Sequence, residues 1–326
     1  MQRPRFELPE ALVMKILSKL PVKSLTRFNC NTSSVYGACH GLLCLHDPLE
    51  DKAAIWNPST REFKILPPSS IQRPPYFSPF EETYLSLDDV SFNNAAFGFD
   101  SKTDDYKVIR FVSLTFVNSE EEYSHPHFLH QVELSDSWKE IPSPDYTPTE
   151  PNGNIFVDGI CYWKTVYGGY LDFRGLILSF DLGNEEFSIL PIPEFVGSLP
   201  EYYVDLLVFN GSLGVIVYPS ERIDTSFDLW VTSEGVWTKQ FNFKSISGVV
   251  RLLGFGKNGD LFLRDTNDEV LLFDASTQEL KELEINTYLD HFRFAISLHA
   301  YVESLVRING IQKLKKHIIR QPARDA

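Results

Sequence analysis

The sequence contains little cysteine and has no long apolar run. Its 326 residues include four cysteines, Cys30, Cys39, Cys44 and Cys161, none of them in a CxxC pair. This content does not fit a disulfide-stapled secreted domain, so we expect a reducing compartment and buried thiols at Cys39 and Cys44. No window resembles a membrane span or a secretory signal. These absences predict a protein of the cytoplasm, the nucleus or both, with no membrane span.

Positive charge is also scarce. The formal net charge is -14, and acidic residues outnumber basic ones along nearly the whole chain before its last residues. Such a surface repels phosphate backbones, so nucleic acid is not an expected partner.

Signatures of catalysis are missing as well. The sequence contains no nucleophile elbow, phosphate-cradling glycine loop, paired zinc ligands, or kinase or dehydrogenase motif. Adjacent carboxylates such as Asp104 and Asp105 should point apart. The histidines His125, His127 and His130 lack a fourth metal ligand and the spacing of a helical zinc motif. We therefore expect no metal, no cofactor and no catalytic residue.

One segment near the start has clear helical periodicity. In residues 8–28, apolar side chains recur at three- and four-residue spacing from Leu12 to Leu20 and form a single stripe. Pro21 should end this helix, and a short second helix should reach Phe28. The pattern predicts a pair of helices with one apolar face.

From Val35 onward the pattern changes to short apolar runs rich in β-branched and aromatic residues, which Gly, Pro, Asn and Asp interrupt. Several segments share a polar anchor followed at fixed spacing by a small polar, a large apolar and an aliphatic residue. Each copy predicts a hairpin whose turn is held by the anchor side chain. The anchors are Asn57, Asp100, Asp181 and Asp274, with looser copies at Val132 and Val231.

A second hairpin signal precedes several copies. Residue pairs that favour tight turns occur at His40-Gly41, Asp158-Gly159, Asn210-Gly211 and Asn258-Gly259. Two hairpins in roughly 40 to 50 residues correspond to one four-stranded propeller blade. We therefore predict a mainly β fold, a β-propeller of about six to seven four-stranded blades behind the short helical segment. A β-sandwich is the alternative, although it would not require such regular anchors.

The ordered motifs carry a family resemblance. Residues 8–28 resemble the first half of an F-box, and residues 35 to about 284 resemble the type 1 plant F-box-associated interaction domain, a kelch-like propeller. The terminal AYVESLVRI is similar to the S-locus F-box subgroup, whose members recognise pollination ribonucleases. The matching motifs are Leu8-Pro9, Ile16-Leu17, Leu20-Pro21, Leu25, ACHGLLCL, WNPSTREFKILP, FGFDSKTDDYKVIR, SWKEI, ILSFDLGNEEFSILPIP, and DLWV with Trp237-Thr238-Lys239.

The sequence departs from the family between the two regions. Cys30 is followed within a few residues by SSVYGACHGLLCL, where the family has a Trp-containing third helix and several dozen further residues. The F-box is therefore truncated. The predicted domains are a partial F-box at 1–30, the F-box-associated propeller at 35–310 and a basic tail at 311–326. We expect the tail to be a solvated terminus, with a short helix for acidic lipid or nuclear import as the alternative.

The resemblance implies that the F-box binds a Skp-type adaptor and, through it, a cullin. Its apolar stripe would dock as a helix in a groove, and packing onto the protein's own β-domain is the alternative. The predicted adaptor-binding residues are Leu8, Pro9, Leu12, Ile16, Leu17, Leu20, Pro21, Leu25 and Phe28.

Three long segments fall outside the hairpin template, at 71–89, 118–130 and 194–205. Their aromatic and acidic residues predict a surface that binds a target protein, in particular a basic one. Solvated loops with packed aromatics are the alternative. The predicted target-binding residues are Tyr76, Phe77, Phe80, Glu120, Glu121, Glu122, Tyr123, Tyr202 and Tyr203.

These expectations combine into a non-catalytic substrate receptor of a Skp-cullin-F-box ubiquitin ligase, which tethers its target through the propeller. The truncation favours a second hypothesis, a degenerate F-box protein that binds targets without recruiting the ligase, as a decoy or a nonfunctional allele. A third is a propeller enzyme like galactose oxidase or sialidase, which would need a metal constellation or an arginine cluster.

Overall fold

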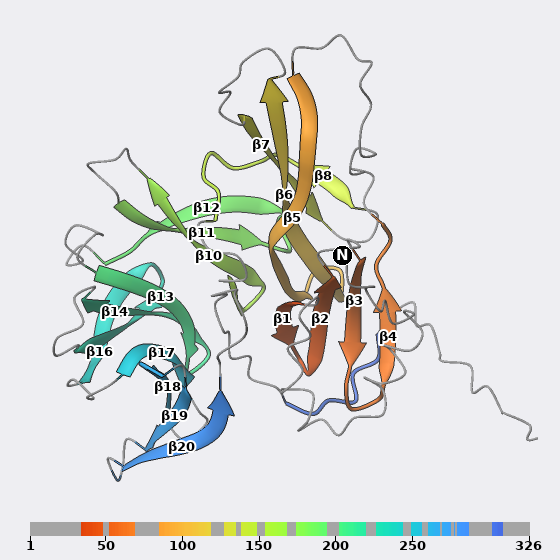
Figure 1. The fold of residues 1–326 in the computed structure, drawn as a ribbon. Helices are drawn as coiled ribbons and strands as arrows, with labels where there is room; N and C mark the ends of the chain where they lie inside the picture. Colours follow the sequence, from red (N-terminus) through yellow and green to blue (C-terminus); the bar gives the residue numbers. More distant parts are fainter. Residues whose placement is uncertain are drawn as a thin grey trace, which may run out of the picture.

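The computed structural model describes residues 34–47, 52–68, 85–118, 127–134, 138–148, 154–167, 174–193, 202–219, 226–243, 249–255, 260–267, 269–274, 277, 279–286 and 302–308. In these ranges the protein consists of strands, turns and extended segments (Figure 1). No helix that could cross a membrane occurs among them. The predicted helical segment at 8–28 lies outside the described residues.

The strands form five four-stranded sheets in chain order. The first sheet contains β1 (Ser34–Cys39), β2 (Leu42–Asp47), β3 (Lys52–Asn57) and β4 (Glu62–Ile65). The second contains β5 (Leu85–Asp100), β6 (Asp105–Asn118), β7 (His127–Leu134) and β8 (Lys139–Ile141). The third contains β9 (Asn154–Val157), β10 (Ile160–Tyr167), β11 (Arg174–Asp181) and β12 (Glu186–Pro191).

The fourth sheet contains β13 (Tyr202–Phe209), β14 (Ser212–Pro219), β15 (Phe227–Ser233) and β16 (Val236–Phe243). The fifth contains β17 (Val249–Phe255), β18 (Leu261–Asp265), β19 (Glu269–Asp274) and β20 (Glu279–Asn286). Every sheet is an antiparallel meander in which strands adjacent in sequence are hydrogen-bonded.

The sheets are arranged as a propeller-like ring (Figure 1). Their first strands contact one another in the order β1, β5, β9, β13 and β17, so these strands are innermost. The fourth strands, from β4 to β20, lie at the periphery of their sheets. The predicted mainly β propeller architecture is confirmed.

The number of blades differs from the prediction. Six template copies suggested six to seven blades, whereas the described residues form five four-stranded sheets. Two of the copies belong to the same sheet, because Asp100 ends β5 whereas Val132 lies in β7. A hairpin of first and second strands has the same local sequence chemistry as one of third and fourth strands, so the template counted the second sheet twice.

Side-chain turns follow the strands at the polar anchors. Asn57 Oδ1 accepts hydrogen bonds from the backbone N–H of Ser59 at 2.9 Å and of Thr60 at 3.2 Å. In these two bonds the side-chain oxygen takes the place of a backbone carbonyl as acceptor, and together they hold the turn. Backbone N–H groups two or three positions later donate in the same way to Asp100, Asp181 and Asp274. The predicted role of these anchors is confirmed.

Two-residue turns with positive φ at both positions join other strands. The predicted pairs His40-Gly41, Asp158-Gly159 and Asn210-Gly211 all have this conformation. It matches the twist of the flanking strands, and glycine adopts it without steric cost. A fourth pair, Glu234-Gly235, joins β15 to β16 and was not predicted as such a turn. The predicted pair Asn258-Gly259 lies outside the described residues.

Each pair of sheets that are consecutive in the chain encloses its own apolar cluster. Cys39 and Cys44 belong to the cluster between the first two sheets, and Trp163 to the next one. Both faces of the middle sheets are therefore buried, as burial of apolar area requires. The buried thiols expected at Cys39 and Cys44 are confirmed, and burial raises the pKa of Cys39 to about 12.

The residues at 302–308 return to the first sheet. Asn57 Nδ2 donates to the carbonyl oxygens of Ser304 at 3.0 Å and Val306 at 2.8 Å. The backbone N–H of Ser304 in turn donates to Ser59 Oγ. Ile308 is 2% exposed and packs in the cluster between the first two sheets. One buried asparagine thus holds both its own turn and a segment about 250 residues later in the sequence.

Candidate functional site

The two ends of every sheet differ. At one end, which we name the turn end, short turns join the first strand to the second and the third to the fourth. At the other, the connection end, lie the links between second and third strands and between successive sheets.

Successive sheets from the second to the fourth point the same way. Asn154 of β9 donates to the carbonyl of Ala95 on β5, and a Cβ at Gly98 would meet Phe156, so these two strands run in the same direction. Lys164, level with the start of β9, donates to Val204 near the start of β13. The connection ends of the third and fourth sheets therefore lie side by side, and that of the second sheet is on the same side but extends beyond them, because β5 begins at Leu85.

Most of the predicted site residues lie outside the described residues. This applies to all nine adaptor-binding residues between Leu8 and Phe28. It also applies to Tyr76, Phe77, Phe80, Glu120, Glu121, Glu122 and Tyr123 of the target-binding set. The later parts of the predicted loops are strands, because β5 starts at Leu85 and β7 at His127.

The described ends of the three predicted target-binding segments nevertheless place their attachment points. One segment joins β4 to β5, another joins β6 to β7, and the third joins β12 to β13. All three links begin and end at the connection end of their sheets. The sequence could not indicate this common position, because it follows from strand order and direction.

Tyr202 and Tyr203 are the two predicted residues that the structure describes. They are adjacent on β13, so their side chains lie on opposite faces of the strand. Tyr202 packs against the apolar cluster between the third and fourth sheets. Tyr203 is 54% exposed, and its ring centroid lies 5.5 Å from that of Tyr218, its cross-strand partner on β14. Only the second tyrosine therefore presents its ring to solvent.

Polar groups from two sheets surround this aromatic pair. Tyr218 donates a hydrogen bond to Asp205 Oδ2 at 2.8 Å. Lys164, on β10 of the third sheet, places its Nζ 3.8 Å from Asp205 Oδ1 and donates to the carbonyl of Val204 at 2.9 Å. We call Tyr203, Tyr218, Asp205 and Lys164 the tyrosine patch. An exposed aromatic ring with a supporting polar shell suits protein binding, because such rings bury much area at low entropic cost.

Sequence analysis proposed Tyr203 as a target-binding residue but did not single out Tyr218, Asp205 or Lys164. Tyr218 and Asp205 become neighbours of Tyr203 through the β13–β14 register. Lys164 arrives from a different sheet, 40 residues before Val204. Alternation in a half-exposed strand could have grouped Tyr203 with Asp205, but no local signal marks the other two.

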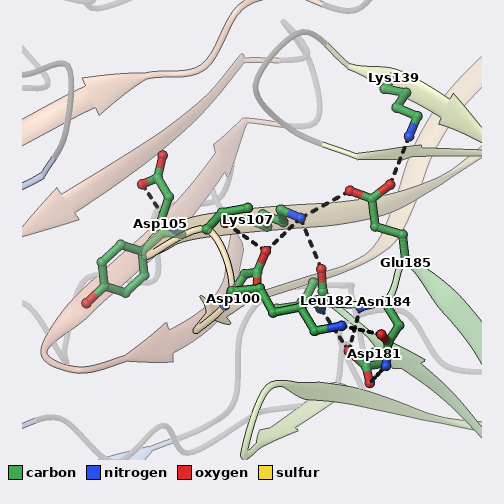
Figure 2. A network of polar contacts seen from close by, with 12 residues as sticks. Asp100, Asp105, Lys107, Lys139, Asp181, Leu182, Asn184 and Glu185 are labelled. Carbon is green, nitrogen blue, oxygen red and sulfur yellow. Dashed lines mark hydrogen bonds and ion pairs between the residues drawn. The ribbon is translucent and has the colours of Figure 1, made fainter.

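A buried polar network lies at the turn end between the second and third sheets (Figure 2). Lys107 on β6 is 7% exposed, and its Nζ lies 2.9 Å from Asp100 Oδ2. The same ammonium group donates to the carbonyl of Leu182 at 3.0 Å and to Glu185 Oε1 at 3.1 Å. Glu185 Oε2 also pairs with Lys139 Nζ at 2.9 Å. The network thus connects three strands of one sheet, β5, β6 and β8, to the β11–β12 turn of the next.

The charges of this network stabilise one another. Burial alone would raise the pKa of Asp100, but hydrogen bonds from Lys107, Thr103 and the backbone N–H of Lys102 lower it to about 2. Burial would lower the pKa of Lys107, and Asp100 and Glu185 reverse this effect and raise it. The hydrogen bond from Lys139 is the main cause of the lowered pKa of Glu185. We interpret the network as a clasp between blades, since each of its ions is matched by opposite charge.

Among the described residues, no group of three or more His, Cys, Asp or Glu side chains is placed to hold a metal ion. The side chains of His125, His127 and His130, considered above as a histidine cluster, lie outside the part of the chain whose side chains are described.

Comparison with known proteins identifies the family. Residues 5–308 match the F-box associated beta propeller domain. F-box protein CPR1 of Arabidopsis thaliana is 29% identical over 279 residues, which cover 78% of this chain and 64% of that protein. F-box protein At4g19940 and F-box/kelch-repeat protein At3g23880 of the same plant are 26% and 24% identical, and the matches cover 77% and 74% of this chain.

The chain spans less than two thirds of the length of these relatives, 62% and 61% for the last two. The family match, in contrast, extends over every described strand and over the docked segment that ends at Ile308. The meander sheets and their ring arrangement are what a domain of that description requires. The chain therefore belongs to the F-box associated beta propeller domain family.

Proposed function

We propose that this protein is the non-catalytic substrate-recognition subunit of a Skp-cullin-F-box ubiquitin ligase. The observation that carries this proposal is the order of two regions: an F-box-like stripe at residues 8–28 lies directly before a propeller whose relatives are named F-box proteins. The stripe would bind a Skp-type adaptor, and the propeller would bind the target. The predicted division into residues 1–30, 35–310 and 311–326 is part of the proposal.

The position of the first strand supports a tethering role. Phe28, the last predicted adaptor-binding residue, is joined to Ser34 at the start of β1 by residues 29–33. Such a link spans at most about 20 Å even when fully extended. The adaptor would therefore be held near the connection end of the first sheet.

The tyrosine patch lies at the connection end of a different sheet. Figure 1 shows the first sheet and the fourth on opposite sides of the molecule. Adaptor and target could thus occupy the same end of the propeller without competing for one surface. This arrangement supports a mechanism in which binding raises the effective concentration of target lysines near the ubiquitin-loaded enzyme. Cytoplasm and nucleus are the compartments we propose for it.

Co-purification with a Skp-type adaptor tests the proposal. The full chain should retain the adaptor, and a variant lacking residues 1–30 should lose it. Replacing Leu8 and Pro9 together by alanine should weaken binding by about 2 to 4 kcal/mol if these residues are interface hot spots. Tyr203→Ala is the matched control, because this surface position should leave adaptor binding unchanged. Adaptor binding that survives both the truncation and the double substitution would refute the docking role.

The short link after Phe28 favours a second candidate, a degenerate receptor that binds a target without recruiting the ligase. Only a few residues separate this position from β1, which leaves no room for the third F-box helix of the family. If the full chain is folded by circular dichroism but does not retain the adaptor at micromolar concentrations, the second candidate replaces the first.

A further inference from the structure

We propose that β16, the outer strand of the fourth sheet, is a docking edge for an extended segment of the target protein, which would add a fifth strand to that sheet. The segment would hydrogen-bond to the backbone of β16 and cover the side chains of Val236 and Phe241. This inference rests on the proposed function only in that the segment is assigned to the target, because the edge itself belongs to the propeller.

The edge of β16 is open to a further strand. Among the described strands β16 has β15 as its single neighbour (Figure 1). The two-residue turn Glu234-Gly235 makes Ser233 and Val236 a hydrogen-bonded pair. Backbone groups alternate in direction along a strand, so those of Trp237 and Lys239 point away from β15. These N–H and C=O groups are where a further strand can pair.

The other outer strands have features that prevent such pairing. Short length, proline and charge are the usual ones. β4 and β8 contain four and three residues, β12 ends at Pro191, which has no N–H, and β20 carries charged residues at four of its eight positions. β16 has eight residues and a single charged one, Lys239. Its ladder with β15 is regular over residues 236–239, and a bulge at Gln240 follows.

Apolar side chains are exposed along this edge. Val236 is 67% exposed and Phe241 is 49% exposed. Phe241 lies opposite Leu229, and Val236 shares a face with the cross-strand partner of Val231, so both are on the face whose inner part packs against the fifth sheet. An added strand would bury part of these two side chains, which favours binding.

The strand is already fixed in its extended form. Trp237 Nε1 donates to the carbonyl of Pro191 at 2.9 Å, which ties β16 to the third sheet. Lys239 Nζ lies 2.7 Å from Asp228 Oδ2 on β15, and Asn242 donates to the other oxygen of Asp228 at 2.6 Å. An edge that is held in this way loses little conformational entropy when a partner adds to it.

Charge favours a basic target segment over a second copy of this chain. The formal net charge is -14, so two copies repel each other. Lys239 is matched by Asp228, whereas Glu234 in the turn before β16 is exposed. Glu282 is also exposed and lies opposite Leu271, on the face of β20 that is turned toward the fourth sheet. We therefore assign the edge to a segment in which lysine or arginine alternates with apolar residues.

Amide hydrogen exchange and fluorescence anisotropy on the full chain test the inference. The probe is an octapeptide of alternating lysine and valine. It should bind and slow exchange at the backbone N–H groups of Trp237 and Lys239. The same peptide with methylated backbone nitrogens should bind about tenfold more weakly, because it cannot donate hydrogen bonds to β16. A peptide of alternating glutamate and valine should also bind more weakly.

Two substitutions at one position separate the backbone from the side chain. Lys239→Pro removes an outward N–H, and proline is tolerated at such a position of an edge strand. Lys239→Ala keeps the N–H and, like the proline variant, loses the ion pair with Asp228. Lys239→Pro should therefore bind the lysine-valine peptide about tenfold more weakly than Lys239→Ala does.

A second pair of variants tests the apolar side chains. Phe241→Ala should weaken binding of the lysine-valine peptide about fivefold, the size of a cross-strand contact. Val208→Ala is the matched control, because Val208 is 43% exposed but lies on β13, the inner strand of the same sheet, and should leave binding unchanged. Urea midpoints identify any variant that does not fold, and the peptide comparison on the wild-type protein does not depend on them.

Three results would overturn the inference. The first is unchanged exchange at Trp237 and Lys239 in the presence of millimolar lysine-valine peptide. The second is equal binding of the methylated peptide, which would indicate charge attraction without strand addition. The third is a dimer in analytical ultracentrifugation that Lys239→Pro abolishes, which would assign the edge to a second copy. Adaptor co-purification separates this inference from the proposed function, because it depends on residues 1–30 and not on β16.

Discussion

Lys107 and Asp100 form a buried ion pair, with Nζ and Oδ2 2.9 Å apart and side-chain exposures of 8% and 1%. Removing two charges from water is costly, and their attraction offsets that cost only when further polar groups complete the site. The carbonyl of Leu182 and the carboxylate of Glu185 complete it here, and both belong to the next sheet. We therefore expect this pair to specify how the second and third blades align more than to add net stability.

Replacing Lys107 by Met should destabilise the fold by about 3 kcal/mol, because it leaves the buried Asp100 carboxylate without its ionic partner. Urea unfolding followed by circular dichroism measures this loss. Lys139→Met is the matched control in the same network. Since Lys139 is 64% exposed, its loss should cost less than about 1 kcal/mol. Equal losses for the two variants would rule out the clasp.

Stability should fall at acid pH because of the carboxylates in this network. The pKa of Asp100 is about 2 in the folded protein and 3.8 for an unperturbed group, so the folded state favours the ionised form. This contribution is complete above about pH 4 and is lost as the pH falls to about 2. The lowered pKa values of Glu185 and Asp181 act in the same direction.

Urea midpoints between pH 5 and pH 2 measure this dependence. Asp100→Asn should give a flatter curve than the wild-type protein, because the amide does not titrate. A variant curve parallel to the wild-type curve would contradict the assignment to Asp100.

Two substitutions of Asn57 should separate its role in the β3–β4 turn from its role in holding residues 302–308. Asn57→Asp keeps an oxygen for the backbone N–H groups of its turn but cannot donate to the carbonyls of Ser304 and Val306. We expect hydrogen exchange in residues 302–308 to accelerate in this variant, at a cost of about 2 to 3 kcal/mol for the lost donors and the buried charge.

Asn57→Ala loses both functions and should also accelerate exchange in the β3–β4 turn. Leu305→Ala provides the control on the docked segment, because Leu305 is 85% exposed and should change neither measurement. Slow exchange at 302–308 in Asn57→Asp would show that the segment is held by other contacts.

Two glycines in the same kind of turn should respond differently to alanine. Gly41 and Gly159 have φ values of 78° and 84°, so alanine is strained at both positions. A Cβ at Gly41 would also lie 2.4 Å from both Ser304 Cβ and Val302 O, whereas a Cβ at Gly159 would meet nothing within 4 Å.

Thermal unfolding should therefore show a loss of about 1 kcal/mol for Gly159→Ala. The loss should be about 3 kcal/mol for Gly41→Ala, because overpacking adds to the strain. Similar losses of stability at the two positions would mean that residues 302–308 can move away from the added Cβ at Gly41 without destabilising the fold.

The sequence predicted those parts of the fold that depend on neighbouring residues. The Asn57 and Asp181 turns and the Asp158-Gly159 hairpin follow from side-chain and φ preferences within a few positions, and the structure confirms them. The same local chemistry could not distinguish the two hairpins at Asp100 and Val132, which share a sheet. The number of blades was therefore overestimated.

The candidate sites depended on contacts that no local pattern encodes. Lys107 and Glu185 are 78 residues apart, and their pairing requires knowledge of which sheets are neighbours. Tyr203 could be recognised as an aromatic residue beside a long segment, but its support by Tyr218 follows only from strand register. The remaining predicted binding residues, such as Leu8 and Glu121, lie outside the described residues and stay predictions.

The separation of the turn end from the connection end has an evolutionary consequence. An insertion in a two-residue turn such as Asp158-Gly159 changes the turn type or shifts the strand register, and a shift of one residue moves the side chains beyond it to the opposite face. A longer link can gain or lose residues at a small entropic cost. Duplicated genes of this family could therefore diversify what they capture by exchanging segments at one rim, while the opposite rim preserves the shape of the scaffold.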